Sequence, residues 1–298
     1  MRRSQAGVRL SGSGEVSMEP RERSYLGLSA KGFHRLVYWE WGEARQAPVL
    51  LCVHGLTRQG RDFDALAAAL APHYRIACPD IVGRGRSDWL ADKAGYGYPQ
   101  YCADMAALIA RLGSETVDWL GTSMGGLIGM MLAAQPKSPI RRLVLNDIGP
   151  LVPKSGVERL AKYVGKDPRF PSLAAAIAYT REVAAPFGAL SEAEWRHLTV
   201  HGVREEPDGS WRLAYDPAVA APFQGEIKDV DLWGLWDRIR CPTLVLRGAA
   251  SDLLLPETAA EMQRRGPRAK LVEIPGCGHA PALMAAEQIA IVREFLLG

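Results

Sequence analysis

The residues with the clearest chemical potential form the pentapeptide 121–125, which reads Gly-Thr-Ser-Met-Gly. It directly follows the apolar run 117–120 and comes just before the helical apolar run 127–134. A serine on a tight strand-to-helix turn exposes its hydroxyl, and glycines two residues to either side let the backbone bend. A glycine-rich turn that merely opens a helix is the simpler reading, but this context favours Ser123 as a nucleophile that attacks an ester-like carbonyl.

A second turn, His54-Gly55-Leu56-Thr57, follows the apolar run 49–53 and is placed to supply half of an oxyanion hole. We predict that the backbone N–H groups of Leu56 and Met124 are the two donors, since Met124 follows the nucleophile. His54 is either a structural residue of this turn or a substrate contact. Arg58 lies two residues beyond Leu56 and is a candidate for binding an acidic group of the substrate, although a surface role fits equally well.

The general base has to be a histidine that can reach Ser123. Of the six histidines, His279 follows the last predicted strand in a glycine-flanked loop, Gly276-Cys277-Gly278-His279. We predict that His279 is this base. Four others are expected to be surface or packing residues: His34, His73, His197 and His201.

Two carboxylates at strand ends are candidates to orient the histidine. Both Asp252 and Asp147 lie between Ser123 and His279 in the chain, which is the order that serine, acid and histidine take in enzymes with a serine on such a turn. Asp252 follows the penultimate strand, which should lie beside the strand that leads to His279. Asp147 sits tightly against its own strand, where a carboxylate often caps or anchors a loop. We therefore predict Asp252 as the acid and keep Asp147 as the alternative.

The elements that must position these residues alternate between short apolar runs and helical patterns, which is typical of parallel strands joined by crossover helices. The sequence predicts strands at 25–29, 34–41, 49–53, 75–78, 117–120, 142–145, 243–246 and 271–274. It predicts helices at 63–70, 101–112, 124–135, 173–184, 191–200, 256–265 and 282–297. The expected fold class is α/β, with an eight-stranded, mostly parallel sheet and helices on both faces.

The rhythm breaks between residue 150 and residue 236, where helical pieces alternate with proline and glycine and no strand run is found. We predict a helical cap at 150–236, inserted into a core made of 23–149 and 237–298 and placed over the carboxyl edge of the sheet. Residues 1–22 read as a disordered leader, and Met18 is a possible second start.

Composition excludes several other functions. The chain has 298 residues, a net charge of +3 and no basic stripe, which argues against a nucleic-acid partner. The five cysteines form no C-x-x-C pair, and no apolar run is long enough for a signal peptide or a membrane span. Together these observations predict a soluble, cytoplasmic protein with free thiols. The glycines of 83–89 are not followed by a helix start, which argues against a phosphate-binding loop.

Taken together and in this order, the motifs resemble those of the α/β-hydrolase fold family, and within it the capped esterase and lactonase-like members. The likeness covers residues 24–298. It rests on His54-Gly55, Asp80 with the run 83–88, residues 121–126, the run 143–147, Asp252, and residues 276–279. The resemblance implies a Ser123, Asp252, His279 triad, oxyanion donors on Leu56 and Met124, a cap over the pocket, and neither a metal nor an organic cofactor. Dehalogenases and epoxide hydrolases of this fold carry aspartate at the nucleophile position, so the serine disfavours both activities.

The expected function is that of a carboxylesterase-like serine hydrolase acting on a small ester or lactone-like molecule through an acyl-enzyme. A lactonase or a carbon-carbon bond hydrolase with the same triad is the nearest alternative, and a cofactor-free perhydrolase is a third. A non-catalytic small-molecule receptor on the same fold is the alternative from another class. The sequence leaves the substrate and the oligomeric state open.

Overall fold

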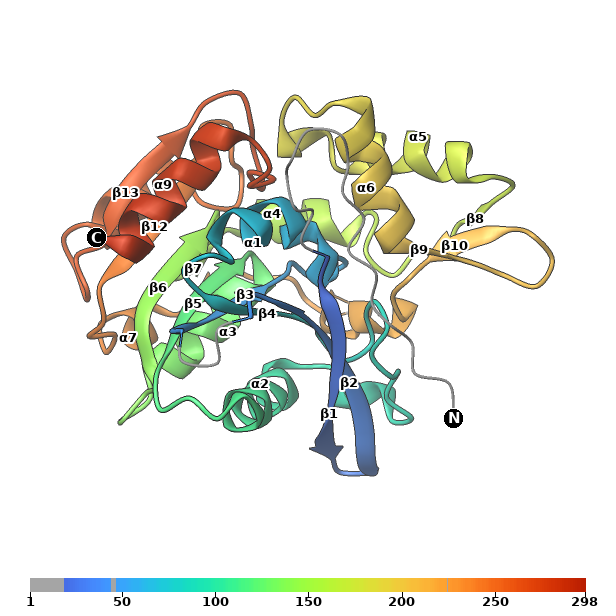
Figure 1. Cartoon of the computed structure of the whole chain (residues 1–298). Helices are drawn as coiled ribbons and strands as arrows, with labels where there is room; N and C mark the ends of the chain where they lie inside the picture. The colour runs from blue at the N-terminus through green and yellow to red at the C-terminus, as the bar shows by residue number, and fades with distance from the viewer. Residues whose placement is uncertain (1–18, 44–46, 224) are drawn as a thin grey trace, which may run out of the picture.

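A computed structural model describes residues 19–43, 47–223 and 225–298 of the chain (Figure 1). Its centre is an eight-stranded sheet in the order β1-β2-β4-β3-β5-β6-β12-β13. The strands are β1 (Arg21–Ser29), β2 (Gly32–Trp41), β3 (Val49–Val53), β4 (Arg75–Asp80), β5 (Val117–Thr122), β6 (Ile140–Asn146), β12 (Thr243–Gly248) and β13 (Lys270–Ile274). Each of the eight predicted strands corresponds to one of these, so the predicted fold class is confirmed.

Only β2 runs against the rest of the sheet. β1 pairs antiparallel with β2, and β2 pairs antiparallel with β4. The pairs β3–β4, β3–β5, β5–β6, β6–β12 and β12–β13 are all parallel. The carboxyl ends of these parallel strands therefore meet at one edge, where side chains that follow different strands converge.

Helices cover both faces because alternate strand residues point to opposite sides. In β3, Leu50 and Cys52 pack in the core layer that contains residues of α1 (Asp64–Leu70) and α9 (Ala286–Leu297). Leu51 and Val53 pack in the layer that contains residues of α2, α3 and α8. These three helices are α2 (Tyr98–Leu112), α3 (Met124–Ala133) and α8 (Pro256–Met262). Burial on both sides explains why the central strands read as continuous apolar runs rather than alternating ones.

The 150–236 segment contains more than helices. Its helices are α4 (Lys154–Ala161), α5 (Leu173–Val183), α6 (Glu192–Gly202) and α7 (Trp233–Trp236). Its strands are β7 (Leu151–Val152), β8 (Arg169–Phe170), β9 (Val203–Glu205), β10 (Trp211–Leu213) and β11 (Val230–Asp231). The prediction that no strand occurs here is wrong, because strands of two or three residues are too short to produce a readable pattern. Figure 1 shows α5, α6 and the β8–β10 sheet gathered on one side of the molecule.

The amino-terminal boundary also differs from the prediction. The predicted leader covers residues 1–22, and residues 1–18 of it lie outside the described part of the chain. Arg21 and Glu22 already belong to β1, where Arg21 pairs with Glu40. Within the described ranges, no helix has the length and apolar character that crossing a membrane requires.

Candidate active site

Ser123 stands on a sharp bend between β5 and α3. Its backbone angles are φ 52° and ψ −116°, and residues other than glycine rarely adopt a positive φ. A Cβ added at Gly121 would overlap the backbone of Gly125, and one added at Gly125 would overlap the carbonyl of Val53. The two glycines of the pentapeptide are therefore required by close backbone approach, and together they hold the Ser123 hydroxyl out of the turn.

This packing gives the first testable prediction. We expect Gly125→Ala to lower the free energy of unfolding by about 3 kcal/mol or more, because β3 and α3 must separate to admit the methyl group. The matched control is Gly234→Ala, since a Cβ on Gly234 meets no atom within 4 Å. Chemical denaturation of both variants checks the prediction, and equal stabilities would show that the turn relaxes at little cost.

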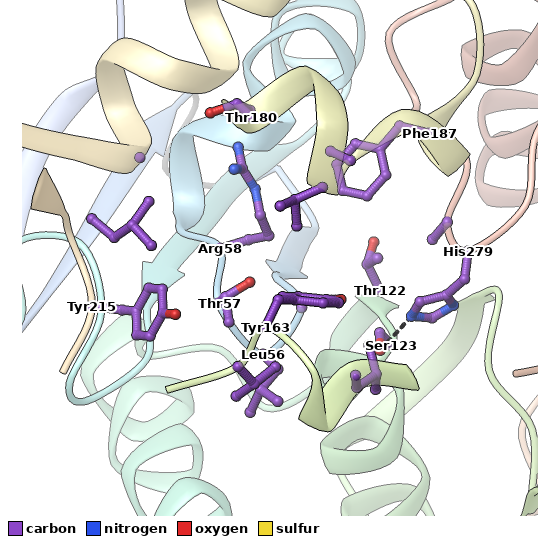
Figure 2. A pocket seen from close by; sticks show the side chains of 18 of the residues that line it. Leu56, Thr57, Arg58, Thr122, Ser123, Tyr163, Thr180, Phe187, Tyr215 and His279 are labelled. Carbon is purple, nitrogen blue, oxygen red and sulfur yellow. Dashed lines mark hydrogen bonds between the residues drawn. The ribbon is translucent and has the colours of Figure 1, made fainter. Parts of the chain in front are cut away.

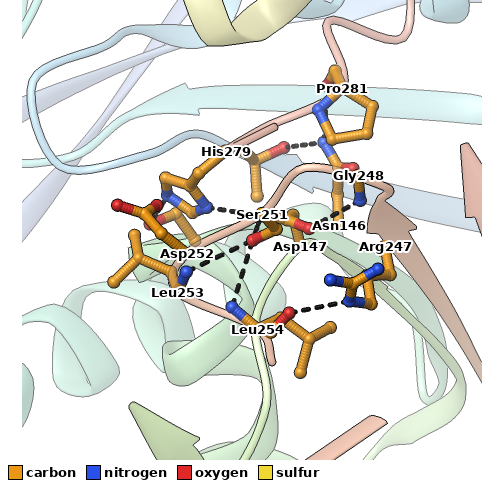
Figure 3. A network of polar contacts seen from close by, with 12 residues as sticks. Asn146, Asp147, Arg247, Gly248, Ser251, Asp252, Leu253, Leu254, His279 and Pro281 are labelled. Atoms are coloured by element: carbon orange, nitrogen blue, oxygen red, sulfur yellow. Dashed lines mark hydrogen bonds and ion pairs between the residues drawn. The ribbon is translucent and has the colours of Figure 1, made fainter. Parts of the chain in front are cut away.

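A continuous chain of hydrogen bonds joins three side chains at the carboxyl edge of the sheet. The Nε2 atom of His279 lies 2.8 Å from the Oγ of Ser123, and its Nδ1 lies 2.8 Å from Oδ2 of Asp147 (Figures 2 and 3). His279 follows β13, Ser123 follows β5 and Asp147 follows β6. With Nδ1–H donating to the carboxylate, Nε2 presents a lone pair to the serine hydroxyl.

Asp147 is fully buried and held from several sides. Its Oδ1 accepts the backbone N–H of Gly248 at 2.7 Å, and its Oδ2 accepts the hydroxyl of Ser251 at 2.5 Å as well as the bond from His279. Ser251 in turn accepts the backbone N–H of Leu254 at 3.1 Å. These hydrogen bonds fix the direction of the carboxylate (Figure 3).

The sequence-based assignment of Asp252 as the partner of His279 is not what the structure shows. The carboxylate of Asp252 forms an ion pair with Arg159 of α4, in which Nη2 of Arg159 lies 2.9 Å from Oδ1, and the Asp252 side chain is 46% exposed. The physical reason lies in the strand order. β6 lies between β5 and β12, so Asp147, the residue after β6, lies beside Ser123. Asp252 lies in the loop after β12, one strand farther from β5, and its side chain faces Arg159 of the 150–236 segment.

The turn after β3 is held in place from behind. His54 is fully buried: its Nδ1 lies 2.7 Å from the carbonyl of Gly55, and its Nε2 accepts the backbone N–H of Ile81 at 3.0 Å. Burial lowers the pKa of His54 to about 3, so the ring is neutral. Since both nitrogens are occupied by backbone, the suggestion that His54 binds substrate is wrong, and the residue shapes the turn instead.

Arg84 supports the same turn, a role that the sequence analysis missed. Its guanidinium is completely buried, donates to the carbonyl of Leu56 at 2.9 Å and to the hydroxyl of Tyr101 at 3.1 Å, and lies over the Tyr101 ring. Arg84 thus fixes the peptide unit between Leu56 and Thr57, whereas the unit that carries the Leu56 N–H is held by His54 through the carbonyl of Gly55. Met124 is the first residue of α3, so its N–H has no acceptor within the helix. Both N–H groups are thus suited to meet an oxyanion.

Arg58 lies in the same cavity as Ser123. Its Nε and Nη2 donate to Asp62 at 2.6 Å each, and Nη2 also donates to the carbonyl of Leu198 at 3.0 Å. The remaining Nη1 lies 3.4 Å from the position that a Cβ on Gly202 would take. Arg58 therefore spans from the core to α6, with one nitrogen of its fork left towards the cavity (Figure 2).

The cavity above Ser123 is lined mainly by apolar and aromatic side chains of the 150–236 segment. These are Leu160, Tyr163, Val164, Tyr179, Val183, Ala184, Phe187, Leu213 and Tyr215. Its polar groups are few and include Thr57, Arg58 and Thr180. Such a lining suits a small, largely apolar molecule with a polar group at a fixed place. The sequence analysis named none of these apolar residues, because short elements without a clear period give no signal of which side chains converge.

Comparisons with known proteins agree with this fold. The model of the alpha/beta hydrolase family matches residues 50–291. The 3-hydroxybutyrate-oligomer hydrolase of Cupriavidus necator is 48% identical over 95% of this chain and 100% of its own length. Among solved structures, a putative hydrolase from Rickettsia typhi has a TM-score of 0.87 at 33% identity, covering 94% of this chain and 99% of that one. An alpha/beta hydrolase from Novosphingobium aromaticivorans has a TM-score of 0.84 at 37% identity, with coverages of 94% and 98%. This chain therefore belongs to the alpha/beta hydrolase family.

Proposed function

We propose that this chain is a serine hydrolase that cleaves carboxylic esters, with Ser123 as nucleophile, His279 as general base and Asp147 as the orienting acid. The observation that carries the proposal is the unbroken hydrogen-bond chain from Asp147 through His279 to Ser123 at the floor of a mostly apolar cavity. The acid in this proposal is Asp147, the alternative named from the sequence, and not Asp252, the preferred candidate.

The reaction follows from these contacts. The Oγ of Ser123 attacks the ester carbonyl while Nε2 of His279 takes the proton of the serine hydroxyl. The oxyanion of the tetrahedral intermediate accepts hydrogen bonds from the N–H groups of Leu56 and Met124. The imidazolium then protonates the departing alcohol, which leaves an acyl-enzyme. Water enters, loses a proton to His279 and releases the acid. Asp147 stabilises the imidazolium from its buried position and does not take up the proton.

For the substrate we propose short oligomers of 3-hydroxybutyrate. The support is the similarity along the full length of the 3-hydroxybutyrate-oligomer hydrolase, together with the character of the cavity. Such an oligomer carries one methyl group per unit, one ester between each pair of neighbouring units, a hydroxyl at one end and a carboxylate at the other. Aromatic and aliphatic side chains match the methyl-bearing chain, and a cation matches the terminal carboxylate.

Arg58 is our candidate for that cation. The point where a Cβ would sit on Gly55 lies 3.7 Å from Cβ of Ser123 and 4.0 Å from Cγ of Arg58, so the two side chains start close together. Arg58 and Ser123 also line the same cavity, so a substrate bound at Ser123 can extend towards Arg58. We infer that Arg58 binds the carboxylate of the unit on the leaving-group side, so that the enzyme releases monomers from the carboxyl end of the oligomer.

We further propose that the 150–236 segment acts as a cap over the site and that the protein works in the cytoplasm on a small molecule. The first is supported by the many cavity-lining residues in that segment. The second is supported by the free cysteines, of which Cys52, Cys78 and Cys277 are buried.

Substrate profiling tests the proposal. Purified protein is given the dimer and trimer of 3-hydroxybutyrate, their methyl esters, a butyrolactone and a series of p-nitrophenyl acyl esters, and product acids are measured. We expect turnover of the esters with the highest kcat/KM on the free-acid oligomers. Turnover of lactone alone would point to a lactonase. Labelling of Ser123 by a fluorophosphonate with no turnover of any ester or lactone would instead support a receptor.

A second prediction concerns Arg58. We expect Arg58→Met to raise KM at least ~10-fold for the free-acid dimer and to leave KM for its methyl ester within about 2-fold, since a charge-assisted hydrogen bond contributes about 1.5 kcal/mol or more. Because Arg58→Met leaves Asp62 without its partner, the double variant Arg58→Met/Asp62→Asn is measured beside it. Equal losses on acid and methyl ester in both variants would mean that Arg58 only holds the core to α6.

A further inference from the structure

Three potential metal ligands meet where the core and the 150–236 segment touch, away from Ser123. Asp64 begins α1, and His197 and His201 lie one turn apart on α6. One ligand atom from each can be chosen so that all three lie within 4.8 Å of one another. The two imidazole rings stand 4.8 Å apart between their centroids, as expected for residues at i and i+4 on one helix face. The sequence analysis treated both histidines as surface or packing residues, because a helix pattern cannot show which acid lies opposite.

The Asp64 carboxylate lacks part of the hydrogen bonding that burial demands. The residue is only 8% exposed. Its Oδ2 accepts Nε of Arg61 at 2.6 Å and lies 3.5 Å from Nε2 of His197. Its Oδ1 is buried and has no hydrogen-bond partner within the described part of the chain. A buried carboxylate with a free lone pair is a site that a cation would complete.

Each of the two imidazoles can offer one ring nitrogen as a ligand, and these atoms lie within 4.8 Å of each other and of a carboxylate oxygen of Asp64. His197 has its Nε2 2.9 Å from the carbonyl of Arg61, which leaves Nδ1 or a rotated ring for coordination. Two imidazoles and one carboxylate form a ligand set typical of Zn²⁺ and of related transition metals.

We propose that Asp64, His197 and His201 form a binding site for a divalent transition-metal ion, which links α1 of the core to α6 of the 150–236 segment. Water would fill the remaining coordination position. The proposal does not depend on the proposed ester hydrolysis, because none of the three residues contacts Ser123 or His279.

Positive charge around the site opposes the ion and limits its affinity. Arg61 is the nearest cation and would share the Asp64 carboxylate with the metal, because it binds Oδ2 and leaves Oδ1 free within the described part of the chain. Its guanidinium also lies 4.8 Å from the centroid of the Trp39 ring, which gives it a second favourable partner. Arg58 and Arg86 act on His201 from farther away. We therefore expect micromolar rather than nanomolar binding.

Binding would restrain the segment that lines the cavity. α6 carries Leu198, whose carbonyl accepts Arg58, and it ends at Gly202, which lines the cavity itself. An ion that joins α6 to α1 would fasten this wall to the core. Because the ligands come from elements far apart in the chain, the ion should also raise the temperature of unfolding.

The test uses the full-length chain without an affinity tag, freed of metal with a chelator. Isothermal titration with ZnCl₂ should show one site per chain, and Co²⁺ should give the visible absorption bands of a tetrahedral complex. Asp64→Asn and His201→Ala should each weaken Zn²⁺ binding at least ~10-fold, since each removes a ligand. The control His73→Ala removes an exposed histidine elsewhere, beside Arg293, and should bind as the parent does.

Two results would overturn the proposal. One is the absence of Zn²⁺ binding to the parent chain in the micromolar range. The other is unchanged binding by His201→Ala and Asp64→Asn, which would place the ion at other histidines. Thermal unfolding without metal shows whether each variant is folded, and Asp64→Asn preserves side-chain size where His201→Ala does not.

Discussion

Replacing Asp147 with asparagine should reduce kcat/KM for p-nitrophenyl acetate by about 10⁴-fold, the scale known for the carboxylate of Ser-His-Asp triads. The amide removes the negative charge that stabilises the imidazolium at His279. It can also present its NH₂ group to Nδ1, which would force the ring into the tautomer with its proton facing Ser123. Steady-state kinetics with the purified variant measures the effect.

The decisive comparison is Asp252→Asn, for which we expect a loss of less than about 10-fold. That carboxylate pairs with Arg159 and is half exposed, so its removal disturbs the contact with α4 rather than the histidine. The loss of kcat/KM for Ser251→Ala should lie between those of Asp147→Asn and Asp252→Asn, since this change deletes one hydrogen bond to Asp147. A greater loss for Asp252→Asn than for Asp147→Asn would restore Asp252 as the acid and show that the loop after β12 rearranges in solution.

The contrast between the two acids shows what a sequence can and cannot predict here. Ser123 and His279 could be predicted because each depends on local chain geometry: glycines flank the serine on a strand-to-helix turn, and glycine precedes the histidine after the last strand. The choice between Asp147 and Asp252 depends on which strand ends lie beside Ser123. Both aspartates obey the same order along the chain, and only the sheet order, with β6 next to β5, separates them.

The strands of the core were predictable for a related reason. Residues such as Leu50 and Leu51 are buried on opposite faces of the sheet, so β3 must be apolar throughout and is bounded by polar turns. The cavity wall has no such constraint. Tyr163, Tyr179 and Phe187 come from short elements whose arrangement is set by packing against the core. The burial of Arg84 beneath Leu56 could not be predicted either, because no sequence pattern marks an arginine as buried.

Removal of the Ser123 hydroxyl should have an effect at least as large as loss of the acid. We expect Ser123→Ala to lower kcat/KM for p-nitrophenyl acetate at least ~10⁴-fold and to abolish covalent labelling by a fluorophosphonate, because no acyl-enzyme can form without Oγ. Alanine is smaller than serine and Ser123 already has a left-handed backbone, so the bend should persist and circular dichroism should be unchanged.

Ser114→Ala is the matched control for the labelling, since that serine lies in the loop between α2 and β5 and its hydroxyl donates to the carbonyl of Thr116. Residual activity of Ser123→Ala would come from the oxyanion donors and from His279 acting on water directly. Turnover near that of the parent chain would mean that the ester is attacked by another group. In that case the hydrogen bond between Ser123 and His279 would be structural, and the nucleophile would have to be sought among the other polar groups of the cavity.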